Sequence, residues 1–114
     1  MIINFDDFKK IEMKIGEVVS AQRVEGSDKL LKLMIDIGEL DEGGLKKPRQ
    51  ILAGIGKNNE PESLVGKQIA IVANLEPRMM MGLESQGMVL AVTGENGPLV
   101  LNPAGIVPPG TLLS

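Results

Sequence analysis

The stretch Leu31-Lys32-Leu33-Met34-Ile35-Asp36-Ile37 decides the fold class of this chain. Aliphatic residues occupy every second position, and Lys32, Met34 and Asp36 stand between them. Because successive side chains of a β-strand point to opposite faces, this alternation predicts a half-buried strand. The segment that follows, Gly38 to Pro48, is polar and glycine-rich and predicts a hairpin loop, and Arg49 to Gly54 predicts the next strand.

Three further segments are predicted to be strands. Met13 to Val24 is a long strand whose hydrophobic phase slips near Gly16, and we expect a bulge or bend there. Such a bent strand would belong to two faces of a small barrel. Gln68 to Leu75 and Met88 to Thr93 are apolar on both faces, as expected for central strands of a closed barrel.

Two short helical segments accompany the strands. Asn4 is a favoured N-cap for a helix that reaches about Lys10, and Glu60 to Leu64 predicts a single turn with proline at its start. Five short strands with glycine turns predict an all-β fold, a five-stranded Greek-key OB-fold barrel with a short N-terminal helix and a C-terminal extension. We expect one domain over residues 1–114.

The C-terminal extension, about residues 96–114, contains no charged side chain. It combines aliphatic residues with four prolines. A segment this apolar is not expected to be disordered. It is expected to fold back over the barrel, to form a subunit interface, or to do both.

Composition excludes several functional classes. The chain has no cysteine and no histidine, which removes disulfides, most zinc sites and most catalytic triads. We therefore expect no enzyme activity, no cofactor and no metal. No apolar run reaches the length of about 18 residues that predicts a membrane helix, and no secretion signal is indicated, so a cytoplasmic location is expected. The net charge of −3 means that any nucleic-acid binding requires a local basic patch.

Short runs of residues follow one another along nearly the whole chain in a characteristic order. They are Asp7 to Met13, Val24 to Leu31, Arg49 to Ile51, Ala53 to Ile55, Pro61 to Glu62, Leu64 to Lys67, Asn74 to Arg78, Gly82, and Ser85 to Met88. Together they resemble the tRNA-binding domain at the C-terminus of methionyl-tRNA synthetases. They are also similar to free-standing homodimeric tRNA-binding proteins and to domains related to endothelial-monocyte-activating polypeptide. The resemblance implies an OB-fold that binds the outer corner of tRNA by shape, and isolated members that form homodimers through their terminal extensions.

Seven residues of this frame are candidates for tRNA contact: Lys29, Lys32, Arg49, Asn74, Arg78, Ser85 and Met88. The lysines and arginines suit phosphates, and Arg78 also suits base stacking; the alternative for each is solvated surface charge. The amide of Asn74 suits a base edge or a 2′-hydroxyl, or else it holds a turn. Ser85 either donates to RNA or caps its loop, and Met88 either contacts a base or packs in the core.

Two hypotheses remain. The first is a tRNA-binding module, a C-terminal domain or β subunit that raises the tRNA affinity of a methionyl-tRNA synthetase catalytic chain. The second is a protein-binding, chaperone-like homodimer of the same fold family. Met79 to Met81 stand where relatives carry basic residues, and the barrel has no aromatic residue on which bases stack. The Met79 to Met81 run and the negative net charge favour the second hypothesis more than the first.

Overall fold

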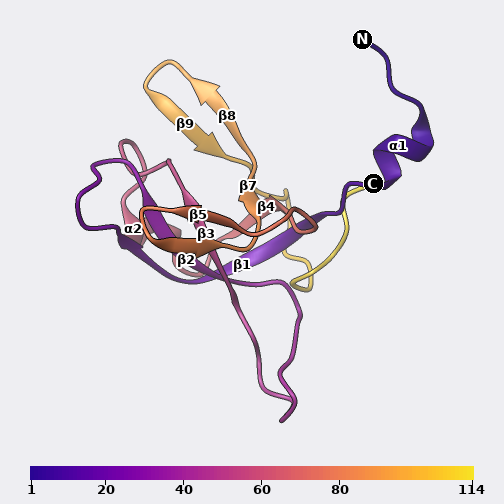
Figure 1. Ribbon diagram of the computed structural model, residues 1–114, viewed down its shortest axis with the longest axis horizontal. Helices are drawn as coiled ribbons and strands as arrows, with labels where there is room; N and C mark the ends of the chain where they lie inside the picture. Colours follow the sequence, from indigo (N-terminus) through magenta and orange to yellow (C-terminus); the bar gives the residue numbers. More distant parts are fainter.

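Five strands wind into a nearly closed antiparallel barrel in the computed structural model, which describes residues 1–114 (Figure 1). The barrel strands are β1 (Met13–Arg23), β2 (Leu31–Asp36), β3 (Arg49–Ala53), β4 (Gln68–Val72) and β7 (Met88–Val89). Their order is β3-β2-β1-β4-β7. A hydrogen bond from the Gln86 N–H to the Gln50 carbonyl joins β3 to the chain just before β7. The predicted all-β barrel of OB type is confirmed.

The long strand β1 is shared between two faces of the barrel, as predicted. Its first half, from Met13 to Glu17, pairs with β4, and its second half pairs with β2. The expected bulge lies elsewhere, because the register shifts between Val18 and Ser20 while Gly16 stays in the regular ladder. Gly16 has a packing role instead: a Cβ there would lie 2.3 Å from the Ile35 side chain.

The interior of the barrel is aliphatic. Leu33 and Ile35 of β2, Ile51 of β3, and Ile69 and Ile71 of β4 are fully buried in one cluster. The two helices lie outside this sheet. Helix α1 (Phe5–Lys9) begins at Asn4, whose side chain caps it as predicted, and α2 (Pro61–Leu64) turns the chain between β3 and β4 and buries Leu64. Neither helix is long enough to cross a membrane.

Two predicted strands end earlier than expected. Strand β4 stops at Val72, so Asn74 and Leu75 lie in a bend after the strand and not on it. The fifth strand was predicted to run from Met88 to Thr93, but it leaves the barrel after Val89. The chain from there forms a separate hairpin, β8 (Ala91–Gly94) with β9 (Gly97–Val100), which projects from the barrel (Figure 1). The turn Glu95-Asn96 reverses the chain, Gly97 begins β9 at φ +122°, and pairing within this hairpin replaces pairing in the barrel.

The C-terminal extension folds back along the barrel, which confirms the first of its two expected roles. The Gly110 N–H donates to the Ile15 carbonyl at 2.7 Å, and the Ile15 N–H donates to the Thr111 carbonyl at 2.9 Å. Backbone contact is so close that a Cβ on Gly110 would lie 2.3 Å from the Ile37 carbonyl oxygen. The extension thus forms backbone hydrogen bonds with the edge of the first half of β1.

Candidate nucleic-acid interface

A second small hairpin lies across one flank of the barrel, beside β3 and β7. It is formed by β5 (Arg78–Met80) and β6 (Leu83–Ser85), joined by the two-residue turn Met81-Gly82. Both turn residues have positive φ, 50° and 80°. Type I′ turns of this kind match the twist of a hairpin but favour Asn-Gly, so Met81 holds a strained conformation. This hairpin was missed in the sequence because Met81 does not carry the usual turn signal.

Ser85 fastens the hairpin to the barrel. Its side chain is only 3% exposed, and its Oγ accepts the Leu52 N–H at 3.0 Å and donates to the Gly87 carbonyl at 3.0 Å. The Gln50 side chain adds a bond to the Glu84 carbonyl at 2.9 Å. Of the two roles considered for Ser85, the contacts within the chain match the loop cap.

Arg49 joins several segments beneath the same flank. Its Nε and Nη2 both donate to the Glu39 carboxylate, and its Nη1 donates to the carbonyls of Ala73 and Gln86. The hydrogen-bonded carboxylate raises the pKa of Arg49, and the guanidinium lowers the pKa of Glu39, although partial burial opposes both shifts. Four of the five guanidinium donors are thus engaged inside the chain.

Asn74 connects the N-terminal helix to the end of β4. Its Oδ1 accepts the Glu12 N–H at 2.8 Å, and its Nδ2 donates to the Lys10 carbonyl at 2.6 Å. The side chain lies at the surface, but its oxygen and its nitrogen both have partners within the chain. This arrangement positions α1 against the barrel.

Three of the predicted cations carry no carboxylate partner. Lys29, Lys32 and Arg78 take part in none of the six salt bridges of the protein. All three lie around the β5–β6 hairpin. Lys32 lines a hollow of about 280 Å³ with Met81 of the turn, and the stem of Lys29 approaches Gly54, which lines a cavity with Arg78. Three cations without a carboxylate partner therefore lie around this hairpin, together with Glu25, Glu76 and Glu84, which also form no salt bridge.

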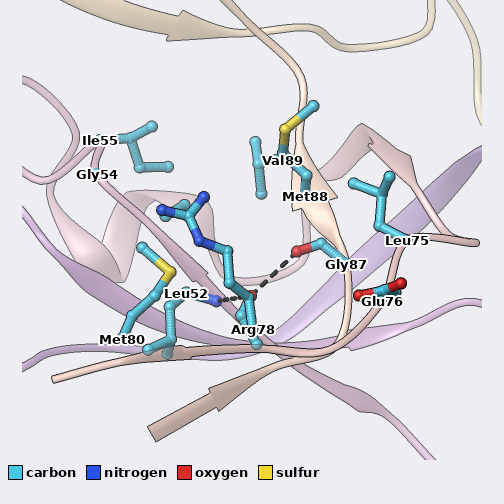
Figure 2. A pocket seen from close by; sticks show the side chains of 12 residues that line it. Leu52, Gly54, Ile55, Leu75, Glu76, Arg78, Met80, Gly87, Met88 and Val89 are labelled. Atoms are coloured by element: carbon cyan, nitrogen blue, oxygen red, sulfur yellow. Dashed lines mark hydrogen bonds between the residues drawn. The ribbon is translucent and has the colours of Figure 1, made fainter. Parts of the chain in front are cut away.

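The Arg78 cavity has a volume of about 220 Å³ and a mainly apolar lining (Figure 2). Leu52 and Ile55 lie along its barrel side, and Met80, Met88 and Val89 complete the apolar part. Figure 2 shows the Met80 thioether beside the Arg78 side chain, with Val89 and then Met88 across the cavity from it. Glu76 lies on the other side of the cavity, next to Gly87. Met88 is 46% exposed, so the core packing considered for it is not its main environment.

Sequence reasoning assigned no role to Glu76 or Ile55, which line this cavity with the predicted Arg78 and Met88, and it considered Met80 only within the run Met79 to Met81. The sequence pattern that could have placed Met80 beside Arg78 is the alternation of side chains along β5. Because side chains of a strand alternate, Arg78 and Met80 share a face while Met79 takes the other. That pattern has meaning only once residues 78–85 are recognised as a hairpin.

A closed antiparallel barrel that carries unpaired cations and an apolar cavity on one flank defines an oligonucleotide-binding barrel of OB type. Residues 13–112 match the family described as a putative tRNA binding domain. The chain belongs to this family.

Known relatives agree with the assignment. The methionine–tRNA ligase of Methanothrix thermoacetophila is 47% identical over 109 residues, which is 96% of this chain and 15% of that protein. The crystal structure of a MetRS-related protein from Pyrococcus horikoshii superposes with a TM-score of 0.87 at 33% identity, covering 100% of this chain and 99% of that one. The chaperone CsaA of Bacillus anthracis superposes with a TM-score of 0.83 at 33% identity and full coverage of both chains.

Proposed function

We propose that this chain is a tRNA-binding module that serves a methionyl-tRNA synthetase, and that it has no chemistry of its own. The observation that carries this proposal is the grouping of Lys29, Lys32 and Arg78, without carboxylate partners, around the β5–β6 hairpin. Cations in such positions displace the counterions of a phosphate backbone and draw an RNA to one face. The similarity to methionine–tRNA ligases supports tRNA as the ligand and the cytoplasm as the location.

The module would act through effective concentration. An RNA held by one domain meets the catalytic chain far more often than a free RNA does, so the affinity of each site alone can be modest. Arg49, Asn74 and Ser85 then contribute by holding the face in shape, and Lys29, Lys32, Arg78 and Met88 by touching the RNA.

Salt dependence of tRNA binding tests this proposal. Bulk tRNA is titrated against the protein at several salt concentrations, with Lys29→Ala, Lys32→Ala and Arg78→Ala as variants. Each phosphate contact contributes about −0.7 to −0.9 to the slope of log K against log salt, so each lysine variant should flatten the slope by up to about 1, and Arg78→Ala should weaken binding. Lys67→Ala is the matched control, because Lys67 is also exposed and unpaired but lies beside α2. Wild-type binding that ignores salt would refute the proposal.

We infer that two copies of the chain associate through the C-terminal extension. Its apolar side chains remain exposed after it folds back, with Ile106 at 86%, Leu112 at 61% and Leu99 at 50%. Apolar surface of this kind is characteristic of contact sites.

A protein-binding role, like that of the chaperone CsaA, is the second candidate. The observation in its favour is the exposure of Met79 (65%) and Met81 (57%), because exposed methionines form adaptable apolar contacts. In the tRNA titration, this role predicts that the lysine variants are indistinguishable from wild type. In a separate titration with unfolded polypeptide, it predicts that Met79→Ser and Met81→Ser reduce binding.

A further inference from the structure

The Arg78 cavity differs from a phosphate site in its charges. Arg78 and Glu76 are its only charged lining residues, and neither takes part in a salt bridge. Their charges cancel, so the cavity has no net attraction for an anion, and Glu76 would repel a phosphate oxygen. The free charge suited to phosphates lies outside it, on Lys29 and Lys32.

The rest of the lining suits a flat, apolar face. Leu52, Ile55 and Val89 are apolar lining residues, the Met80 thioether lies beside the Arg78 side chain, and Met88 lies across the cavity (Figure 2). The barrel has no aromatic residue for stacking, and polarizable thioethers pack well against aromatic rings. The ligand that combines such faces with polar edges is a nucleobase.

We propose that the cavity receives a single unpaired guanine of the bound RNA, a proposal that rests on the proposed function. Guanine presents O6 and N7 as paired acceptors, and an arginine guanidinium can donate one hydrogen bond to each of them. It also presents N1–H and its exocyclic amino group as paired donors, which suit the Glu76 carboxylate. Adenine offers a donor where Arg78 requires an acceptor, so the same cavity discriminates against it.

Gly54 lines the cavity, and the position of a Cβ on it lies in open space. A Cβ on Gly54 meets no atom nearer than Cδ of Lys29 at 4.0 Å, and its φ is outside the left-handed region. Gly54→Leu therefore adds apolar volume at the rim while every charge is kept. Gly43→Leu is the matched control, because its Cβ meets only Oδ1 of Asp41, at 3.4 Å, in the loop between β2 and β3.

The experiment uses methionine-methyl NMR of the whole chain, which has seven methionines, titrated with guanosine, inosine and adenosine. Nucleosides carry no phosphate, so a response reports the base site alone. Guanosine is expected to shift the Met80 and Met88 methyl signals and to bind at least about fivefold more tightly than adenosine. Inosine lacks the exocyclic amino group, so it should bind wild type more weakly than guanosine does. For the Glu76→Gln variant, the affinities for inosine and guanosine should be equal.

Gly54→Leu and Arg78→Lys should abolish the guanosine response, and Gly43→Leu should keep it. The inference is overturned if guanosine leaves both methyl signals in place, if adenosine binds as well, or if Gly54→Leu responds like wild type. A parallel tRNA titration separates the two proposals. Salt-sensitive tRNA binding without a guanosine response refutes the guanine site alone, and a guanosine response without tRNA binding refutes the proposed function alone.

Discussion

Arg49 and Glu39 form a two-point ion pair, with both N–O distances, Nε to Oε1 and Nη2 to Oε2, at 2.9 Å. The pair fastens the start of β3 to the long loop that follows β2. Hydrogen bonding to the guanidinium lowers the pKa of Glu39 below its ordinary value of 4.5.

This pair predicts a pH-dependent contribution to stability. Because the pKa of Glu39 is lower in the folded than in the unfolded chain, its contribution is present above about pH 4.5 and is lost as the pH falls through the folded value. Thermal unfolding should show Glu39→Gln melting below wild type at pH 7, with the difference shrinking toward pH 3. A constant difference across this range would contradict the prediction.

Replacement by alanine is expected to lower the Tm at Arg49 and to weaken tRNA binding at Arg78. Arg49→Ala leaves Glu39 and two backbone carbonyls without their donor, so the Tm should fall by at least about 5 °C. Arg78 has no partner within the chain, so Arg78→Ala should leave the Tm within about 2 °C while it weakens tRNA binding. Calorimetry and the tRNA titration measure the two effects, and equal Tm losses would show that the structural assignment is wrong.

Ser85→Ala is expected to loosen the β5–β6 hairpin. The substitution leaves the buried Leu52 N–H without an acceptor, which destabilises the folded state by about 1–3 kcal/mol. Urea unfolding gives the free-energy difference. Ser20→Ala is the control, because Ser20 is exposed on β1 and its side chain has no hydrogen bond in the structure. A loss at Ser85 no larger than at Ser20 would count against the anchoring role.

Met81→Asn is expected to stabilise the protein. Met81 has a φ of 50°, a conformation that disfavours most side chains by roughly 1–2 kcal/mol and that asparagine tolerates better. The free energy of unfolding should rise by up to about 1 kcal/mol. Met79→Asn on β5, where φ is not positive, serves as the comparison and should not gain stability.

Charge placed on the C-terminal extension should separate the proposed dimer. Ile106→Glu combined with Leu112→Glu puts two carboxylates on side chains that are exposed in the single chain, so folding should survive. Sedimentation should change from dimer to monomer with an unchanged circular dichroism spectrum. A dimer that persists would place the interface elsewhere.

The barrel could be predicted from the sequence because its strands have strong, regular patterns. The alternation from Leu31 to Ile37 and the two-sided apolar run of β4 leave few other folds. Local steric effects were harder to predict: Gly16 interrupts the pattern, yet its reason is the Ile35 side chain on the neighbouring strand. A pattern along one strand cannot show such a contact.

The candidate site was only partly predictable. The sequence predicted RNA contact for Arg49, Asn74 and Ser85, but residue type could not show that each already has partners within the chain. Several of those partners, such as Glu12 for Asn74 and Leu52 for Ser85, come from segments far away in the sequence. The cavity around Arg78 depends on a hairpin turn at Met81 that carries no common turn signal.

The folded-back extension also bears on how the chain is made. On the ribosome, the first half of β1 emerges long before Gly110 and Thr111, whose backbone groups later bond to Ile15. Until then the nascent chain presents open strand edges at Met13 and Ile15, and such edges pair readily with other chains. A chain truncated before Gly110 is therefore expected to aggregate when it is expressed. A chaperone that shields this edge during translation should raise the yield of soluble protein.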